Sequence, residues 1–382
     1  MATEATQTLP ADRLSLLVLD PVGGEGWGGV ERWLWDVAQG LRARGHRVCM
    51  AGRADSRWLT RSREAGFPVC DVPLRSDFHL GQARKLSRFM QQQGVDVVAT
   101  KLHRGIRVAG FAARFAGAPP VVAFMGLVET RPGLRYRLTY DLFLDRVVTL
   151  TGRMRDEIIA AGRLDPSAVV AIPYGIRAGD YELPESEGLA VRRELGIDAA
   201  TPVALAIGRL HLQKRFDLLF DAFALARERR PDALLLLAGH GRLLPELEAR
   251  IAKLGLAPAV RLLGFRSDVA RVLAASDCLV MSSDFEGLPM VILEAMASAR
   301  PVVTTNVGSI DDEVVDGRTG RLVGKGDAAA LADALAGVLC LPDRGRAMGR
   351  AGREKVLADF PLDRCIEATE RHLLAVRKVA SR

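Results

Sequence analysis

The chain has 382 residues, of which 49% are hydrophobic, so it can bury the cores of two or three domains, and a disordered chain is excluded. No apolar run reaches the roughly 18 residues that a membrane-spanning helix needs. The net charge of +7 lies entirely in residues 1–180, which hold 25 basic and 18 acidic residues, whereas residues 181–382 hold 28 of each. The first half is therefore expected to face an anionic lipid, a phosphorylated acceptor or nucleic acid.

The cysteines and the N-terminus indicate the compartment. Five cysteines are scattered without C-x-x-C spacing, which indicates a reducing environment and argues against a disulfide or zinc framework. The first residues lack a basic start followed by an apolar stretch, so no secretory signal is predicted. A cytoplasmic protein is therefore expected.

The chain opens with a β-α-β pattern around a glycine-rich turn. Residues 14–19 (LSLLVL) predict a buried strand, a helix ends near Arg44, and residues 46–52 predict the next strand. In the turn between them, Gly24, Gly26 and Gly29 satisfy G-x-G-x-x-G, a weak dinucleotide fingerprint on its own. The confirming acid is absent after the second strand, where Arg53 instead suits an NADP phosphate.

Strands and helices continue to alternate as far as Ile176. Further strands are predicted at 67–74, 95–100, 121–126, 146–152 and 169–176, with helices at 81–93 and 106–115. This alternation predicts an α/β fold with a doubly wound parallel sheet. His103 follows one strand and is a candidate site residue, although a single histidine there is more often structural.

A polar, acidic linker is predicted at 178–188, and a second α/β pattern follows it. The strand at 201–210 runs into Arg209 and Lys214, just before a helix at 216–228. A guanidinium fork and an ammonium group that follow a strand end are suited to a pyrophosphate. Further strands are expected at 233–241, 275–283 and 301–308.

Residues 282–301 (SSDFEGLPMVILEAMASARP) predict a loop that runs into a helix, with Glu286 in the loop and Glu294 in the helix. Pro289 suits the first helical position. The free N–H groups and positive dipole end of this helix start favour an anion near Gly287 and Leu288.

Several of these segments resemble one family. They are E-x7-E from Glu286 to Glu294 followed by P-V-V, G-R-L-x-x-x-K from residue 208, G-G-x-E from Gly28, and G-x-x-G-x-L-V from residue 317. Together they resemble the retaining glycosyltransferases of family 4, which have the GT-B fold. Two departures are Met125, where many members carry a histidine, and Arg215, where glycine is usual.

The resemblance implies two Rossmann-like doubly wound domains that face a cleft. Residues 1–178 would bind the acceptor, 179–360 the nucleotide sugar, and 361–382 would form a helix crossing back to the first domain. Arg209 and Lys214 would neutralise the pyrophosphate, together with the N–H groups of Gly287 and Leu288. Glu294 would bind the ribose and Glu286 the donor sugar. Backbone groups near Phe265 and Arg266 would pair with the base edge of the nucleotide. The N–H groups of Gly28 and Gly29 would face the donor phosphates or the acceptor, and His103 would compensate for Met125.

The predicted function is retaining, metal-independent transfer of a sugar from a nucleotide-diphosphate sugar, expected to be a UDP-sugar. The expected acceptor is a glycan or a lipid-linked molecule in envelope polysaccharide or lipopolysaccharide assembly. No cofactor is expected, no nucleic acid partner is expected, and the basic first domain is expected to contact the inner face of the cytoplasmic membrane. Two alternatives stay open: an NAD(P)-dependent oxidoreductase that uses Gly24, Gly26 and Gly29, and a non-catalytic nucleotide-sugar-binding protein.

Overall fold

The computed structural model describes residues 10, 12–24, 26–73, 79–127, 134–161, 164–343 and 345–380. The chain divides into two compact units. Unit 1 comprises Met1–Gly175 and Leu362–Arg382, and unit 2 comprises Ile176–Pro361. None of the described helices is long and apolar enough to cross a bilayer.

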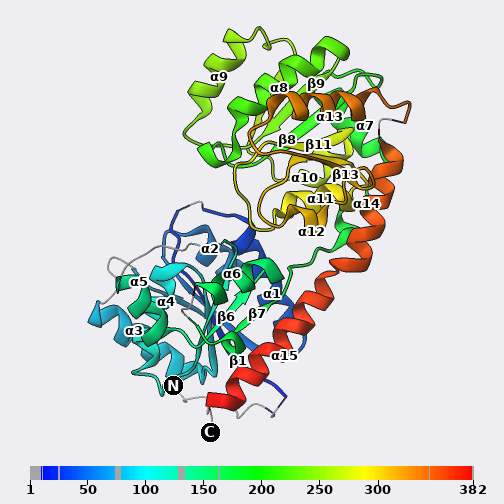
Figure 1. Cartoon of the computed structure of the whole chain (residues 1–382). Helices are drawn as coiled ribbons and strands as arrows, with labels where there is room; N and C mark the ends of the chain where they lie inside the picture. The colour runs from blue at the N-terminus through cyan, green and yellow to red at the C-terminus, as the bar shows by residue number, and fades with distance from the viewer. Residues whose placement is uncertain are drawn as a thin grey trace. The chain divides into compact units, whose positions relative to one another are not determined.

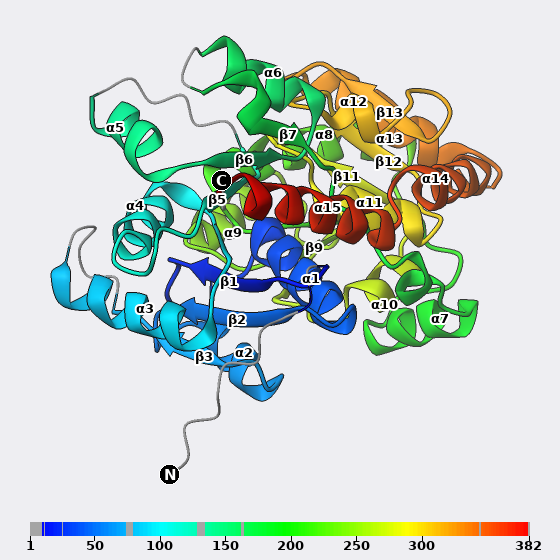
Figure 2. The ribbon, with the colours of Figure 1, turned by 90° about the horizontal axis from the view of Figure 1, so that it is seen from below.

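Unit 1 is built on a parallel sheet. Its described strands are β1 (Ser15–Asp20), β2 (Arg47–Gly52), β3 (Val69–Asp71), β4 (Val97–Thr100), β5 (Val121–Met125), β6 (Arg146–Thr149) and β7 (Val169–Ala171), in the order β3-β2-β1-β4-β5-β6-β7. Figure 2 shows β3, β2 and β1 side by side. The order reverses between β1 and β4, and parallel α/β sheets bind ligands at the carboxyl ends of the strands beside such a point.

Helices cover both faces of this sheet. They are α1 (Gly29–Ala43), α2 (Arg57–Glu64), α3 (Leu80–Gln93), α4 (Leu102–Ala113), α5 (Leu134–Phe143), α6 (Gly152–Ala160) and α15 (Leu362–Ala380), with a short η1 turn at Pro166–Ala168. Leu17 and Leu19 of β1 pack with the apolar sides of α3 and α4. Helix α15 lies along α1 (Figure 1). In this contact, Ile366 of α15 fits over Gly40 of α1.

Unit 2 repeats the plan with its own parallel sheet. Its described strands are β8 (Val203–Ile207), β9 (Leu234–Ala238), β10 (Val260–Gly264), β11 (Cys278–Met281), β12 (Val302–Thr305) and β13 (Gly320–Val323), in the order β10-β9-β8-β11-β12-β13. Its helices are α7 (Glu185–Glu194), α8 (Phe216–Arg229), α9 (Leu244–Lys253), α10 (Val269–Ala274), α11 (Met290–Ala297), α12 (Ile310–Glu313), α13 (Ala328–Cys340) and α14 (Arg346–Asp359), with short turns η2 (Ala178–Tyr181) and η3 (Leu212–Lys214).

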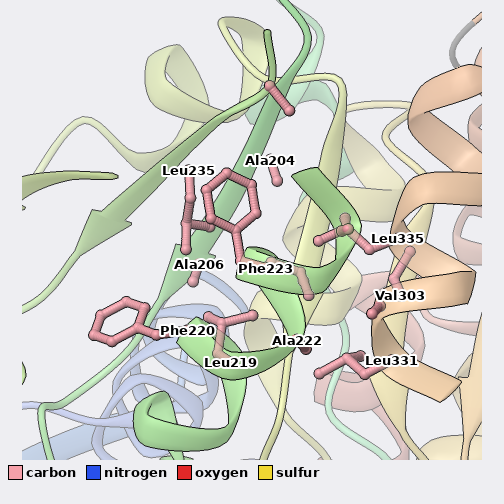
Figure 3. Packing of buried hydrophobic residues seen from close by; sticks show 14 of the residues in the cluster. Ala204, Ala206, Leu219, Phe220, Ala222, Phe223, Leu235, Val303, Leu331 and Leu335 are labelled. Carbon is pink, nitrogen blue, oxygen red and sulfur yellow. The ribbon is translucent and has the colours of Figure 1, made fainter. Parts of the chain in front are cut away.

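The core of unit 2 shows how small and large residues alternate. Ala204 and Ala206 on β8 leave room for the rings of Phe220 and Phe223 on α8, and all four are at most 1% exposed (Figure 3). Leu331 and Leu335 of α13 belong to the same cluster. This packing fixes β8, so the loop that follows its carboxyl end starts from a rigid base.

The predicted doubly wound α/β fold is confirmed, and some boundaries differ. The strand expected at 67–74 is only β3, and Leu74 lies outside the described residues. Helix α4 begins at Leu102 rather than near Ile106, because Leu102 takes a positive φ of 58° that turns the chain straight from β4 into the helix. The expected linker at 178–188 holds η2 and the start of α7, which begins after Pro184 with two glutamates in its first turn.

Candidate functional site

In unit 2, three loops follow the carboxyl ends of β8, β11 and β12, and the first two carry predicted donor residues. Arg209 comes after β8, Glu286 after β11, and Gly308 after β12. The sheet order reverses between β8 and β11, so these loops flank the position where an open α/β sheet binds a ligand.

Lys214 and Glu286 form an ion pair at this edge. The Lys214 Nζ lies 2.5 Å from the Glu286 Oε1, and the two side chains are 18% and 9% exposed. The Lys214 side chain passes over Gly208, where an added Cβ would lie 3.3 Å from its Cε. A short residue after β8 thus lets the ammonium reach the loop that follows β11.

The segment around Lys214 is fastened to the Glu286 loop by further bonds. The Gln213 amide donates to the Phe285 carbonyl at 2.7 Å, and the Ser282 hydroxyl bonds the Lys214 and Arg215 carbonyls at 2.8 Å. Arg215 has φ +48°, which explains why glycine is usual there in the family, and its guanidinium pairs with Asp217 and Asp284. The two loops therefore form one rigid assembly.

Arg209 is an exposed cation at this edge. Its side chain makes no ion pair with any residue that the structure describes. The next residue anchors the loop, because the Leu210 N–H donates to the His240 carbonyl at 2.9 Å. Arg209 is thus on a fixed backbone with its guanidinium available to a ligand.

Glu294 lies in the second turn of α11 and is buried, at 7% exposure. Its Oε1 accepts a hydrogen bond from the Tyr181 hydroxyl at 2.7 Å. Pro289 is the N-cap rather than the first helical residue as predicted, because its ψ of 109° is extended. Gly287 and Leu288, just before it, are buried. The Tyr181 contact could not be predicted, because Tyr181 lies in the segment that was predicted to be a polar linker.

Gly308 holds the third loop against the second. With φ +64°, its position leaves no room for a side chain, since an added Cβ would lie 2.0 Å from the Glu286 carbonyl oxygen. The close approach of Gly308 fixes the backbone of Glu286 from the side of β12.

A buried carboxyl next to this assembly was missed by the sequence prediction. Glu313, at the end of α12, is fully buried, and neither of its carboxyl oxygens has a hydrogen-bond partner among the described residues. Burial raises the pKa of Glu313 well above its ordinary value, and the charges of Glu286 and Asp312 add to the effect. Its surroundings therefore favour the protonated, neutral form of the Glu313 carboxyl. The run Asp311-Asp312-Glu313 was its only sequence signal.

Phe265 and Arg266 follow β10, at the far edge of the sheet order. The Phe265 ring is 55% exposed and meets the His240 ring edge-on, with 5.6 Å between the ring centroids. The Arg266 guanidinium is bound to Asp268 by bonds of 2.8 and 2.6 Å. An exposed aromatic ring thus lies next to a guanidinium that is held in place by Asp268.

In unit 1, Gly28 and Gly29 form the turn that starts α1. Gly28 is the N-cap, and its N–H donates to the Glu31 Oε2 at 3.0 Å. Glu31 also pairs with buried Lys101, whose Nζ lies 3.4 Å from Asp20. Burial raises the pKa of Asp20 to about 6, against the opposing charge of Lys101. The trio lies where β1 and β4 end, at the reversal of the strand order.

The other residues singled out in unit 1 make their described contacts with residues other than Asp20, Glu31 and Lys101. His103 is in the first turn of α4, half-buried, with its ring edge-on to Tyr140 at 5.5 Å. Met125 ends β5 and packs with apolar neighbours. Arg53 is bound to Asp55 by bonds of 2.9 and 2.7 Å, which occupies the group that the oxidoreductase alternative assigned to an NADP phosphate.

Comparisons with known proteins identify the family. Residues 27–179 match the model of Glycosyltransferase Family 4, and residues 201–340 match that of Glycosyl transferases group 1. The chain is 33% identical to the alpha-maltose-1-phosphate synthase of Mycolicibacterium smegmatis, over 74% of this chain and 80% of that protein. It is 30% identical to a GDP-mannose-dependent alpha-(1-6)-phosphatidylinositol monomannoside mannosyltransferase of the same organism, over 73% and 76%.

The solved structures agree on the fold. The crystal structure of Anabaena Alr3699/HepE in complex with UDP and glucose matches 95% of this chain and 100% of its own, with a TM-score of 0.84 at 23% identity. The two parallel α/β sheets thus have GT-B neighbours, as predicted. These matches overturn the oxidoreductase and non-catalytic alternatives. The chain belongs to glycosyltransferase family 4, whose members include retaining enzymes, and transfers a sugar from a nucleotide sugar.

Proposed function

We propose that the enzyme transfers a sugar from a UDP-linked donor to a glycan or lipid-linked acceptor of the cell envelope. Unit 2 (predicted range 179–360) binds the donor, and unit 1 (predicted range 1–178, with the helix of 361–382) binds the acceptor. The observation that carries the proposal is the Lys214–Glu286 pair, which lies at the strand-order reversal of unit 2. A neighbour of the same fold holds UDP and glucose, and one relative acts on a phosphatidylinositol mannoside.

In the proposed mechanism, Lys214 and Arg209 meet the diphosphate as the bond to the sugar breaks. Negative charge grows on the leaving phosphate, so cations placed there stabilise the transition state more than the ground state. The N–H groups of Gly287 and Leu288, before the positive end of α11, add to this stabilisation.

Donor binding exchanges the partners of the central ion pair. Lys214 turns from Glu286 to the diphosphate, and the Glu286 carboxylate accepts a hydroxyl of the donor sugar. Glu294 accepts the ribose hydroxyls while it keeps the Tyr181 bond, and Phe265 covers the base. In unit 1, the Gly28–Gly29 turn and His103 contact the acceptor. The family reaction retains the anomeric configuration, and the acceptor attacks the face that the leaving diphosphate vacates.

The test measures donor binding and turnover with the full chain. Calorimetric titration with UDP, GDP and ADP is expected to show the tightest binding for UDP, and release of UDP from UDP-sugars is expected to follow. Lys214→Ala should weaken the binding of all three diphosphates and slow release, whereas Lys253→Ala, at an exposed lysine on α9, should change neither. Tighter binding of GDP or ADP than of UDP would contradict the proposed donor.

A further inference from the structure

Three tryptophans of unit 1 pack as one cluster beside the glycine-rich turn. The ring centroids of Trp27 and Trp35 lie 5.9 Å apart, those of Trp27 and Trp58 6.2 Å, and those of Trp35 and Trp58 5.9 Å. Trp35 and Trp58 are buried, at 5% and 1% exposure, whereas Trp27 is half-buried. Trp27 is therefore the member of this cluster that solvent and ligands can reach.

Arginines of α2 lie on these rings. The Arg61 guanidinium carbon lies 4.4 Å from the Trp27 centroid and 4.8 Å from that of Trp35, and that of Arg57 lies 5.7 Å from Trp27. In the described part of the chain, no carboxylate lies within ion-pair distance of Arg61. We name Trp27, Arg57 and Arg61 the Trp27 platform.

Positive charge is concentrated on this platform. Burial lowers the pKa of Arg61, and the charges of Arg57 and Arg32 lower it further, against a smaller opposing effect of Asp36 and Glu64. Because no described carboxylate pairs with Arg61, an anion placed against its guanidinium and the apolar rings would compensate its charge. The cluster thus favours a negatively charged ligand over water.

The platform adjoins the proposed acceptor turn. Trp27 directly precedes Gly28, and the N–H of Arg57 donates to the Gly24 carbonyl at 2.9 Å, which fastens the start of α2 to the same turn. This turn follows the carboxyl end of β1, beside the reversal of the strand order. An anion on the platform would therefore lie on the ligand-binding edge of unit 1.

We propose that the Trp27 platform is a subsite for an acceptor sugar that carries a phosphate group. The guanidinium forks of Arg57 and Arg61 match phosphate oxygens in geometry and charge. The half-exposed indole of Trp27 gives the sugar ring an apolar face and a polar edge. This inference rests on the proposed function, because it specifies the acceptor that unit 1 would bind.

The platform is tested by ¹⁹F NMR of the full chain labelled with 5-fluorotryptophan, with Trp27→Phe to identify the Trp27 resonance. Titration with glucose 1-phosphate is expected to shift the Trp27 resonance until the site is saturated. Glucose at the same concentration is expected to leave the resonance unshifted. Arg61→Gln should weaken the binding at least tenfold, and Arg57→Gln provides a second variant if the first misfolds. Arg63→Gln changes an exposed arginine of α2 that lies on none of the aromatic rings in the described part of the chain, and its affinity should stay within about twofold of wild type.

Three outcomes of the sugar titrations would overturn the inference. They are no shift with glucose 1-phosphate, equal shifts with glucose, and equal weakening by Arg61→Gln and Arg63→Gln. A shift with phosphatidylglycerol vesicles alone would also overturn it, because the ligand would then be a membrane rather than a sugar phosphate. UDP titration in the same samples separates the two proposals. If UDP binds and glucose 1-phosphate does not, the platform proposal fails and the donor proposal stands. If glucose 1-phosphate binds and UDP does not, only the donor proposal fails.

Discussion

The ammonium of Lys214 and the carboxylate of Glu286, 72 residues apart in the sequence, lie 2.5 Å apart and largely shielded from solvent. Each group is the other's counter-charge in the absence of donor. Removal of one therefore leaves the other partly buried and unpaired, so the two variants should not behave independently.

The first prediction concerns this pair. Lys214→Ala should lower kcat by about 30- to 1,000-fold, because a single electrostatic donor at a transition state contributes about 2–4 kcal/mol. Glu286→Gln should raise KM for the donor, because the carboxylate that accepts a sugar hydroxyl becomes an amide. Steady-state rates of UDP release check both, together with the double variant. Strict additivity of the two effects would contradict an exchange of partners.

Tyr181→Phe is the second prediction. The change removes the hydroxyl that donates to the Glu294 Oε1, so a buried carboxylate loses one of its bonds. The free energy of unfolding should fall by about 1–3 kcal/mol, and affinity for UDP should fall with it. Urea denaturation and calorimetry measure the two quantities. A variant with unchanged UDP affinity would show that Tyr181 supports folding only and not the ribose site.

The third prediction separates two sources of lost stability at Gly308, which are the positive φ and a steric clash. Gly308→Ala combines a positive φ with a clash against the Glu286 carbonyl, whereas Gly317→Ala has a similar φ of +72° with nothing within 4 Å of the added carbon. Gly317→Ala should therefore cost about 1 kcal/mol, and Gly308→Ala clearly more. Gly308→Ala should also slow donor turnover, because it displaces Glu286. Equal loss of stability in the two variants would refute the close contact.

Glu313 gives the fourth prediction, a dependence of stability on pH. Its pKa is raised in the folded state, so above its ordinary value of 4.5 the folded chain binds more protons than the unfolded chain. Its contribution to stability is thus full at low pH and declines as pH rises, by up to about 1.4 kcal/mol per pH unit. Glu286, Asp312 and Lys355 are the charged groups that act on it.

Glu313→Gln should remove this decline, because the amide cannot lose a proton. Urea denaturation between pH 5 and 8 should show the wild type losing stability relative to Glu313→Gln as pH rises. Glu248→Gln, an exposed residue of α9, is the matched control and should run parallel to the wild type. A constant difference between wild type and Glu313→Gln at every pH would refute a buried neutral acid.

The sequence predicted the elements that local patterns determine. The glycine-rich turn before α1, the loop and helix that carry Glu286 and Glu294, and the strand that leads to Arg209 all have short-range signals, and the structure has each of them. Contacts between distant segments have no such signal. The Tyr181–Glu294 bond joins residues 113 positions apart, and only tertiary packing brings them together.

The burial of Glu313 and the backbone strain at Leu102 could not be predicted from the sequence either. Glu313 belongs to a run of three acidic residues that is typical of a solvated surface, and it is buried because α12 turns it inward. Leu102 takes a positive φ without any glycine or asparagine to indicate it, so the start of α4 was placed four residues late.

Helix α15 belongs to unit 1, although the whole of unit 2 separates it from the rest of that unit in the chain. Glu370 of α15 binds Arg44 and His46, so the early part of the chain needs this late helix to complete its contacts. At ribosomal rates of roughly 5–20 residues per second, the 186 residues of Ile176–Pro361 take roughly 10–40 s to make. During synthesis the first unit to emerge is thus the last to finish folding, and until α15 arrives its uncovered surface of α1 is open to chaperones.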